Sequence, residues 1–454
     1  MGSDHPQPYF ETGHTRWILA SASPRRRALL KQLGLNFSCL TSEVIELARS
    51  DESPRDFAQR MAEEKAMDVA RRSAKALSAM PSEALAEEET WVIGGDTVVA
   101  LGNQILGKPI DALDAESMLA QLSGREHDVW SGWAIVKYTA HTEVEIKRSG
   151  VSRGIVTMRE ISDPEIRAYV ETGEPLDKAG SYGIQGRGGR FVERLAGSLY
   201  GVIGLPLVDL GEAISALNQL PDPAFALRSV KLRERAATAA WRSGRPVDQV
   251  HVLAVSKKHP SQAIITAGAH GLSHFGESYL QELTEKQPAV SESWPSAYAS
   301  EPTWHYIGAI QSKKARHIGS RAQWVHGVSR LIEAQRLAEG AARADHQPRL
   351  FIQVNIAGEA SKGGVDPREV PQLLQRCEEL TSIKVVGLMT FPPLGDPEDN
   401  RVHFRALRAL RDQLTERGFD LPHLSMGTSH DFEVAIEEGA TWVRLGRALF
   451  GERS

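Results

Sequence analysis

Two patterns of apolar and polar positions follow each other along the 454-residue chain. From Val250 onward, short apolar runs alternate with helix-length segments in which apolar residues recur at three- and four-residue spacing. The runs are HVLAVS, HFGES, WHYIGAI, WVHGV, LFIQVNI, VVGLMT, LSMGTS and WVRLGRALFG. Eight strands that alternate with helices predict a (β/α)8 barrel of the TIM type, with its functional residues at the carboxyl ends of the strands.

The first half has an α/β pattern without this regular alternation. The segment WILASASPRRRALLKQLG begins as an apolar strand and becomes a helix, for which Ser23 is a good N-cap, Pro24 suits the first position and Gly34 can form the end. A later stretch, WVIGGDTVVALGNQILGKP, predicts a strand, a tight turn at 94–95, a second strand and a hairpin. The first half is therefore expected to form a separate α/β domain.

A chain of this length exceeds what one hydrophobic core usually organises. The Pro-Asp-Pro sequence at 221–223 ends one helix before the next element starts, which places a domain boundary there. We expect a polar leader over 1–15, an α/β domain over 16–217, a linker with the first helix of the barrel domain over 218–249, and the barrel over 250–454.

Composition narrows the class of protein. Apolar content of 41% and charged content of 24% are ordinary for a folded domain, and a net charge of −5 gives no basic field for nucleic acid or an anionic membrane. Cys39 and Cys377 lie far apart, so reduced thiols are expected rather than a disulfide or a zinc site. The first fourteen residues lack the apolar segment of a signal peptide, and no later run reaches membrane-spanning length. We expect a cytoplasmic protein.

Polar residues at the predicted start of the first helix favour an anionic ligand. Ser21, Ser23, Arg25 and Arg26 lie where free backbone N–H groups and the helix dipole attract an anion. The alternative is that the arginines belong to an ordinary solvated helix start. This cluster alone therefore leaves phosphate binding open.

Two further clusters strengthen the case for phosphate. Asp96 lies among β-forming residues, where a buried carboxylate is usually paired or holds a metal. Lys65 and Lys108 are its expected counter-charges. The stretch DKAGSYGIQGRGGRF adds Lys178, Gln185 and a glycine-rich loop, although such loops are more often turns than phosphate cradles.

The stretches LASASPRR, IGGDTVVALGNQILGKP, LSGREHDVWSG, LDKAGSYGIQG and GVIGLPL resemble the Maf family of nucleoside triphosphate pyrophosphatases, over residues 16–217. The resemblance implies two α/β lobes with a nucleotide between them, and hydrolysis of the α–β phosphate bond that releases pyrophosphate. It makes Asp96 the proton acceptor that orients or deprotonates water beside a divalent cation, Mg²⁺ or Mn²⁺. Glu46, in SEVIE, is the remaining acidic candidate for the metal shell.

The resemblance also bears on the nucleotide. Arg25, Thr97 and Gln185 match the branch that prefers dTTP and UTP, whereas the branch acting on 7-methyl-GTP differs at these places. A glutamine amide can meet the donor-acceptor edge of uracil or thymine. The sequence departs from the family at Gly201, where an asparagine is usual. The other residues expected to contact substrate are Ser21, Ser23, Lys65, Lys108 and Lys178.

Polar residues follow several of the predicted barrel strands. Lys257 follows the first strand, Glu277 ends the second, Asn355 ends the fifth, the segment 425–429 lies along the seventh, and Gly446 follows the eighth. Loops after the last two strands commonly bind phosphate in such barrels. A lysine at the barrel mouth can attach to a carbonyl cofactor, although most lysines are simply surface groups. We expect the neighbouring Lys258 to be one of these.

The stretches LAVSKKHP, HFGESYLQE, WHYIGAIQSKKAR, IQVNIAGEASKGG, GLMTFPP and LSMGTSHDFEVAIEEGATWVRLGRALFG resemble the YggS family of pyridoxal 5′-phosphate (PLP) homeostasis proteins, over residues 224–452. The resemblance implies that Lys257 forms the Schiff base with PLP. By analogy with barrels of the alanine-racemase type, Arg444 faces the unprotonated pyridine nitrogen. The phosphate would be held by Ser425, Gly427, Ser429 and Gly446, with Asn355 as a further cofactor contact. The family's usual asparagine and proline are replaced by Ser278 and Ala309.

Three functions remain open from the sequence. The first is a bifunctional protein that hydrolyses nucleoside triphosphates and carries PLP, with PLP-requiring apo-enzymes as candidate recipients. In the second, the Maf-like half is catalytically silent and both halves only bind ligands. The third is a PLP-dependent amino-acid racemase. Racemases of this type take a second acid/base tyrosine from a further β-domain, and the sequence ends at Ser454 without one, so a carrier is expected.

Overall fold

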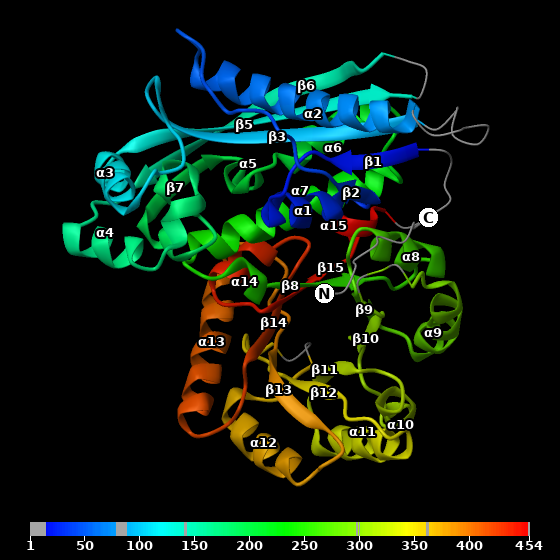
Figure 1. Ribbon diagram of the computed structural model, residues 1–454. Coiled ribbons are helices and arrows are strands. Elements are labelled where there is room, and N and C mark those ends of the chain that lie inside the picture. The colour runs from blue at the N-terminus through cyan, green and yellow to red at the C-terminus, as the bar shows by residue number, and fades with distance from the viewer. Residues whose placement is uncertain are drawn as a thin grey trace. The chain divides into compact units, whose positions relative to one another are not determined.

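The computed structural model describes two compact units, Met1–Val230 and Lys231–Ser454 (Figure 1). The described residues are 15–78, 89–139, 143–296, 298, 300–359 and 363–452. Residues 1–14 of the predicted leader lie outside them. The division between the units falls inside one helix, α7 (Pro223–Arg242), which begins at the second proline of the Pro-Asp-Pro sequence.

A seven-stranded sheet forms the centre of the first unit, with the order β2-β1-β3-β5-β6-β7 and β4 paired to β3. β1 is parallel to β2 and β3, and the other pairs are antiparallel. The strands are β1 (Thr15–Leu19), β2 (Phe37–Cys39), β3 (Glu89–Leu101), β4 (Gln104–Leu106), β5 (Glu126–Tyr138), β6 (Glu145–Met158) and β7 (Val192–Gly197).

The first helix follows its sequence cues. Ser23 caps it by accepting the Arg26 backbone N–H, Pro24 stands at its first position, and Gly34 ends the following 3₁₀ turn with a φ of 70°. The helices of the unit, besides the start of α7, are α1 (Pro24–Leu30), α2 (Pro54–Ser78), α3 (Ala112–Leu122), α4 (Asp163–Val170), α5 (Leu199–Ile203) and α6 (Leu207–Ala216). Short 3₁₀ turns are η1 (Lys31–Leu33), η2 (Glu174–Asp177), η3 (Ala179–Ser181) and η4 (Arg187–Phe191).

The predicted turn at Gly94 and Gly95 is wrong, because both residues lie inside the continuous strand β3. A Cβ on Gly94 would lie only 2.1 Å from the carbonyl oxygen of Ala62 in α2, whereas one on Gly95 would meet Leu205 at 3.3 Å and Arg26 at 3.5 Å. Gly94 thus permits the close approach of α2 to the strand rather than a reversal of the chain.

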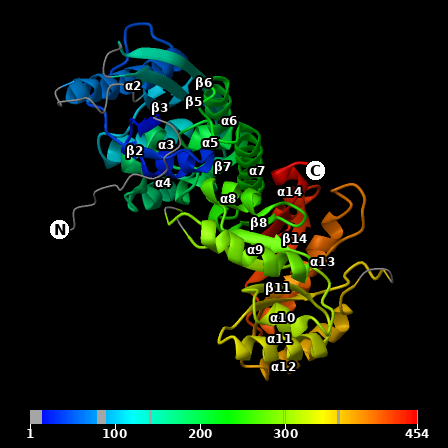
Figure 2. The same cartoon turned by 90° about the vertical axis from the view of Figure 1, so that its right-hand side faces the viewer.

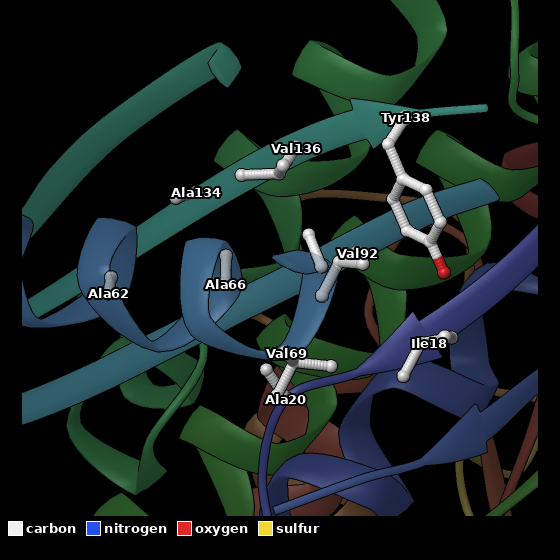
Figure 3. Close-up of a cluster of buried hydrophobic side chains, with 10 residues drawn as sticks. Ile18, Ala20, Ala62, Ala66, Val69, Val92, Ala134, Val136 and Tyr138 are labelled. Carbon is white, nitrogen blue, oxygen red and sulfur yellow. The ribbon is translucent and has the colours of Figure 1, made fainter. Parts of the chain in front are cut away.

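Helix α2 lies across one face of the sheet and packs against β3 and β5 (Figure 1). Figure 3 shows the cluster beneath it, in which small and branched side chains fill the space between α2 and the strands β1, β3 and β5. Its fully buried members include Ala62, Ala66, Val92 and Val136. Burial of this apolar surface fixes the position of α2, and with it Lys65, which lies between Ala62 and Ala66 and belongs to the site described below.

The second unit is a closed barrel of eight parallel strands, which confirms the predicted (β/α)8 fold. The strands are β8 (His251–Val255), β9 (His274–Glu277), β10 (Thr303–Tyr306), β11 (Trp324–Val328), β12 (Arg349–Gln353), β13 (Lys384–Met389), β14 (His423–Thr428) and β15 (Trp442–Leu445). The last predicted run is divided by Gly446: its first part is β15 and its end is the short helix α15 (Arg447–Phe450).

Helices surround the barrel strands (Figure 2). They are α8 (Ser261–Ala269), α9 (Leu280–Ser293), α10 (Ala315–Gly319), α11 (Leu331–Arg343), α12 (Val370–Glu378), α13 (Arg401–Glu416), α14 (Phe432–Glu437) and α15, with 3₁₀ turns η5 (Val247–Gln249) and η6 (Pro367–Glu369). Within the described residues, none of the helices combines the length and apolar character needed to span a bilayer.

Large side chains close the interior of the barrel. It is occupied by a buried core that includes Leu253, Trp324, Phe351 and Trp442. The Trp442 ring packs against the rings of several histidines, and its centroid lies 4.9 Å from that of His305. The interior is therefore packed with side chains, as expected for a barrel of eight strands.

Candidate functional sites

A lysine joins two carboxylates in the first unit. The Lys65 ammonium, on α2, lies 2.7 Å from Asp96 Oδ1 on β3 and 2.5 Å from Glu46 Oε1. Lys65 and Asp96 are both buried, whereas the Glu46 side chain is 47% exposed. The structure thus pairs Asp96 with its expected counter-charge Lys65, and the same lysine holds Glu46, the other residue expected in the metal shell.

Several cations act on the exposed carboxylate of this group. Burial alone would raise the pKa of Glu46, but the hydrogen bond and charge of Lys65 lower it overall, with further contributions from Lys108 and Arg26. Lys108 therefore acts electrostatically on Glu46. Glu46 is kept ionised at neutral pH, with a negative charge at the exposed side of the group.

Arg26 is the arginine that joins the helix start to the strand. Its Nε donates to the Gly204 carbonyl oxygen at 2.9 Å, and its other nitrogens donate to Thr97 Oγ1 at 3.2 Å and Ser21 Oγ at 3.5 Å. Burial lowers the pKa of Arg26, and the charges of Asp96 and Glu46 oppose that shift. The resemblance singled out Arg25 for a substrate role, and that role stays a prediction. The contacts with Gly204, Thr97 and Ser21 are made by its neighbour Arg26.

The Thr97 hydroxyl is held inside this network. It lies 3.0 Å from Ser131 Oγ and 3.3 Å from the Gly204 carbonyl, in addition to its contact with Arg26. Ser131 in turn donates to the Gly201 carbonyl at 2.6 Å. Because Ser131 gives its only proton to Gly201, it accepts from Thr97, whose proton is then not available to the Gly204 carbonyl. Thr97 is thus held between Arg26, from which it accepts, and Ser131. Ser131, which the sequence analysis did not single out, is part of the same network.

The glycine-rich segment is held by an acidic side chain. Glu174 accepts the backbone N–H groups of Arg187 and Gly188 at 3.0 and 3.2 Å, so these two donors are occupied by the protein. Gln185, which lies in the sequence between η3 and Arg187, is exposed. Lys178 pairs with Asp177, and that hydrogen bond, assisted by the charge of Arg25, lowers the pKa of Asp177. The turn interpretation of the loop is therefore the better one.

The acidic residues of the first unit bear on the predicted metal. Among the residues that the structure describes, no group of three or more His, Cys, Asp or Glu side chains is placed to hold a metal ion. Asp96 and Glu46 offer two carboxylates that share Lys65. Mg²⁺ often binds through one or two carboxylates together with substrate phosphates and water. The pair fits a cation that is bound jointly with a nucleotide, rather than one enclosed by protein ligands alone.

In the second unit, Lys257 follows β8 by two residues and is half-buried, whereas Lys258 is exposed in the turn with a φ of 63°. β8 pairs with β15 through Ala254 and Leu445, so the chain after each strand emerges at the same place on the barrel rim. These positions agree with Lys257 at the barrel mouth and Lys258 on the surface.

The loops after β14 and β15 meet beside this lysine. Ser429 Oγ accepts the Ala448 backbone N–H at 3.3 Å, and Gly446 packs against Val255 at the end of β8. Gly427 has a φ of 90°, and a Cβ there would lie 2.6 Å from Ala435, so the backbone approaches α14 closely. The loops that carry Ser429 and Gly446 thus meet at the barrel rim, whereas Gly427 lies within β14 and packs against α14.

Arg444 lies inside the barrel and is only 3% exposed. One terminal nitrogen donates to both the carbonyl and the hydroxyl oxygen of Ser425 at 2.7 Å, and the other donates to the Thr390 carbonyl at 2.9 Å. Its Nε is buried without a hydrogen-bond partner. Burial lowers the pKa of Arg444 to about 10, so it stays charged at neutral pH. The structure groups Ser425 with Arg444 rather than with the predicted phosphate contacts.

Two other predicted mouth residues have structural partners. Glu277 accepts from Ser256 at 2.7 Å and from Lys286 of α9 at 2.9 Å, and burial raises its pKa to about 7 despite Lys286. Its carboxylate therefore belongs to a buried cluster between the barrel and α9. The Asn355 amide donates to the Glu359 carbonyl at 2.9 Å and supports the loop after β12.

Buried histidines make the stability of the barrel depend on pH. Burial lowers the pKa of His305 and His326 well below 6.5, so the unfolded chain binds more protons than the folded one in acid. For each of these histidines, the free energy of unfolding should fall by about 1.4 kcal/mol for every pH unit below about 6.5. Urea unfolding of the barrel transition at pH 7.5 and 5.5 measures this loss.

The matched comparison is His305→Phe against His317→Asn, since His317 is exposed on α10. The first variant should reduce the pH dependence and the second should leave it unchanged. An equal loss of stability in acid for both variants and the parent would show that the buried imidazoles are not responsible.

Comparison with known proteins separates the two halves. Residues 16–217 match the family model described as Maf-like protein, and residues 230–454 match the model described as alanine racemase, N-terminal domain. A dTTP/UTP pyrophosphatase of Desulfotalea psychrophila is 44% identical over 198 residues, which cover 43% of this chain and 92% of the relative. A pyridoxal phosphate homeostasis protein of Aquifex aeolicus is 41% identical over 228 residues, 50% of this chain and 97% of the relative. A solved structure of PipY from Synechococcus elongatus with PLP bound is 35% identical, covers 48% of this chain and 100% of its own, and superposes with a TM-score of 0.42.

Proposed function

Because the chain belongs in its first half to the Maf family and in its second half to the pyridoxal phosphate homeostasis proteins, we propose that it is bifunctional. The first half hydrolyses nucleoside triphosphates to the monophosphate and pyrophosphate, with dTTP and UTP preferred. The second half binds PLP on Lys257 and serves PLP homeostasis, with PLP-requiring apo-enzymes as recipients.

The Glu46–Lys65–Asp96 group is the observation that carries the hydrolase proposal. A buried carboxylate held by one lysine is suited to orient a water molecule and accept its proton, and that is the role we assign to Asp96. Lys65 holds Asp96 in place, while Arg26 and Lys108 supply positive charge for phosphates. A Mg²⁺ or Mn²⁺ ion held by Asp96 and Glu46 would neutralise phosphate charge.

The PLP proposal is supported by a fit between donor and acceptor. The unpartnered Nε of Arg444 is a buried donor, and an unprotonated pyridine nitrogen is an acceptor that would satisfy it. Ser429 and Gly446 belong to the loops after the last two strands, which commonly bind phosphate in such barrels. The cofactor supplies an aldehyde to which the Lys257 amine attaches. An arginine at the ring nitrogen would keep that nitrogen unprotonated.

Nucleotide profiling tests the hydrolase half. Pyrophosphate release with Mg²⁺ should be faster from dTTP and UTP than from 7-methyl-GTP, and Gln185→Glu should reduce that preference. A site whose amide meets a pyrimidine edge disfavours a base that leaves the amide unpaired. Gln121→Glu, an exchange of the same kind at a half-buried position of α3, is the control and should leave the preference unchanged.

Equal turnover of all three nucleotides by the parent protein would refute the predicted specificity. Absence of pyrophosphate from any of them, in a protein that still binds nucleotide, would instead support the catalytically silent alternative.

A further inference from the structure

Three histidines on neighbouring strands form one hydrogen-bonded chain inside the barrel. His274 Nδ1 lies 3.0 Å from His305 Nε2, and His305 Nδ1 lies 3.0 Å from His326 Nε2. His326 Nδ1 lies 2.9 Å from Ser425 Oγ, which accepts from Arg444 at 2.7 Å. The chain thus runs from β9 through β10 and β11 and across the barrel to Arg444.

The surroundings keep the two inner imidazoles neutral. His305 and His326 are fully buried. The titratable groups that act on His305 are His326, His274 and His251, and those acting on His326 are Arg444 and His423. None of these groups offers a negative charge. A protonated imidazole would therefore face other imidazoles or a guanidinium without a counter-ion.

A neutral imidazole has one donor and one acceptor, so the chain has only two consistent directions. If His326 Nδ1 donated, Ser425 Oγ would accept from both His326 and Arg444, and its own proton would need another acceptor. If Ser425 donates to His326 Nδ1, every contact pairs one donor with one acceptor. The positive charge of Arg444 also turns the Ser425 proton away from itself and toward His326.

We propose that His326 is a positioning residue for the cofactor. Through Ser425 it holds Arg444 so that the Nε of Arg444 is available to the pyridine nitrogen. The hydrogen-bonded chain also holds His274, His305 and His326 in the tautomer with the proton on Nε2. This inference rests on the proposed PLP site. The buried histidines then orient the Arg444 guanidinium. His305 and His274 hold His326 in place and do not contact the cofactor themselves.

The tautomers can be observed without cofactor. Long-range ¹H–¹⁵N correlation spectra of the full-length apo-protein, labelled in its histidines, should show three neutral rings with the proton on Nε2. These spectra should not change between pH 8 and pH 6. A proton on Nδ1 of any of the three rings, or protonation of His326 in this range, would overturn the proposed direction of the chain.

Two substitutions separate positioning from packing. The amide of His326→Asn stands near the position of Nδ1 and can still accept from Ser425, whereas the longer His326→Gln places its amide near Nε2 and loses that contact. His326→Asn should bind PLP within a few-fold of the parent, while His326→Gln should bind about tenfold more weakly, as expected for the loss of support for a charged hydrogen bond. The absorbance of bound PLP should also shift with pH in the Gln variant only.

Simple loss of volume predicts the opposite order, because asparagine leaves the larger cavity. Equal binding by the two variants, or weaker binding by His326→Asn, would therefore overturn the positioning role. Failure of the parent protein itself to bind PLP would refute the proposed cofactor site, and the tautomer spectra of the apo-protein would still decide the direction of the chain.

Discussion

Substitution of Asp96 by asparagine is expected to reduce pyrophosphate release by a factor of about 10²–10⁴ and to leave nucleotide binding within a few-fold. The factor is typical of a group that orients water and takes its proton. Asparagine keeps the shape of the side chain but cannot accept a proton or pair ionically with Lys65, which retains Glu46 as a partner. Pyrophosphate release and equilibrium nucleotide binding, measured on the same preparation, separate the two effects.

Asp128→Asn is the matched control for this experiment. Asp128 is also a strand carboxylate with one cationic partner, Arg153 at 2.7 Å, but it lies outside the Asp96 group. The control should retain its activity. Full activity of Asp96→Asn would remove Asp96 from the mechanism, whereas loss of nucleotide binding together with activity would assign it to substrate binding.

The second large effect is expected for Lys257→Ala, which should abolish the covalent attachment of PLP and the visible absorbance that comes with it. Attachment requires the Lys257 amine, whereas the contacts proposed for Arg444, Ser429 and Gly446 are independent of it. The variant should therefore still bind PLP, more weakly, and release it on gel filtration. Absorbance spectra before and after filtration measure both properties.

Lys258→Ala is the neighbouring control and should keep the covalently attached cofactor, since Lys258 is exposed in the turn beyond β8. Borohydride reduction followed by peptide mapping identifies the attached residue directly. Attachment to Lys258 would contradict the assignment of Lys257 to the barrel mouth.

Local features of the structure were predictable from the sequence. The eight apolar runs lie at the barrel strands, and Ser23, Pro24 and Gly34 begin and end the first helix as expected. These features depend on residues that are close along the chain, because hydrophobic periodicity and capping are properties of a few consecutive positions. The need of Asp96 for a counter-charge was predictable for a similar reason, since a strand-bound carboxylate is costly to bury alone.

The partners of these groups were decided by the tertiary structure. Arg26 rather than Arg25 reaches Gly204, which lies 178 residues away, and His326 reaches Ser425 across 99 residues. The Gly94–Gly95 pair is equally compatible with a turn and with a strand under a close helix, and only the packing of α2 on β3 distinguishes the two. The sequence alone determined which segments form strands and helices and which polar groups require partners. Only the fold decided which partners they meet, because contacts between distant segments depend on how the sheet and the barrel pack.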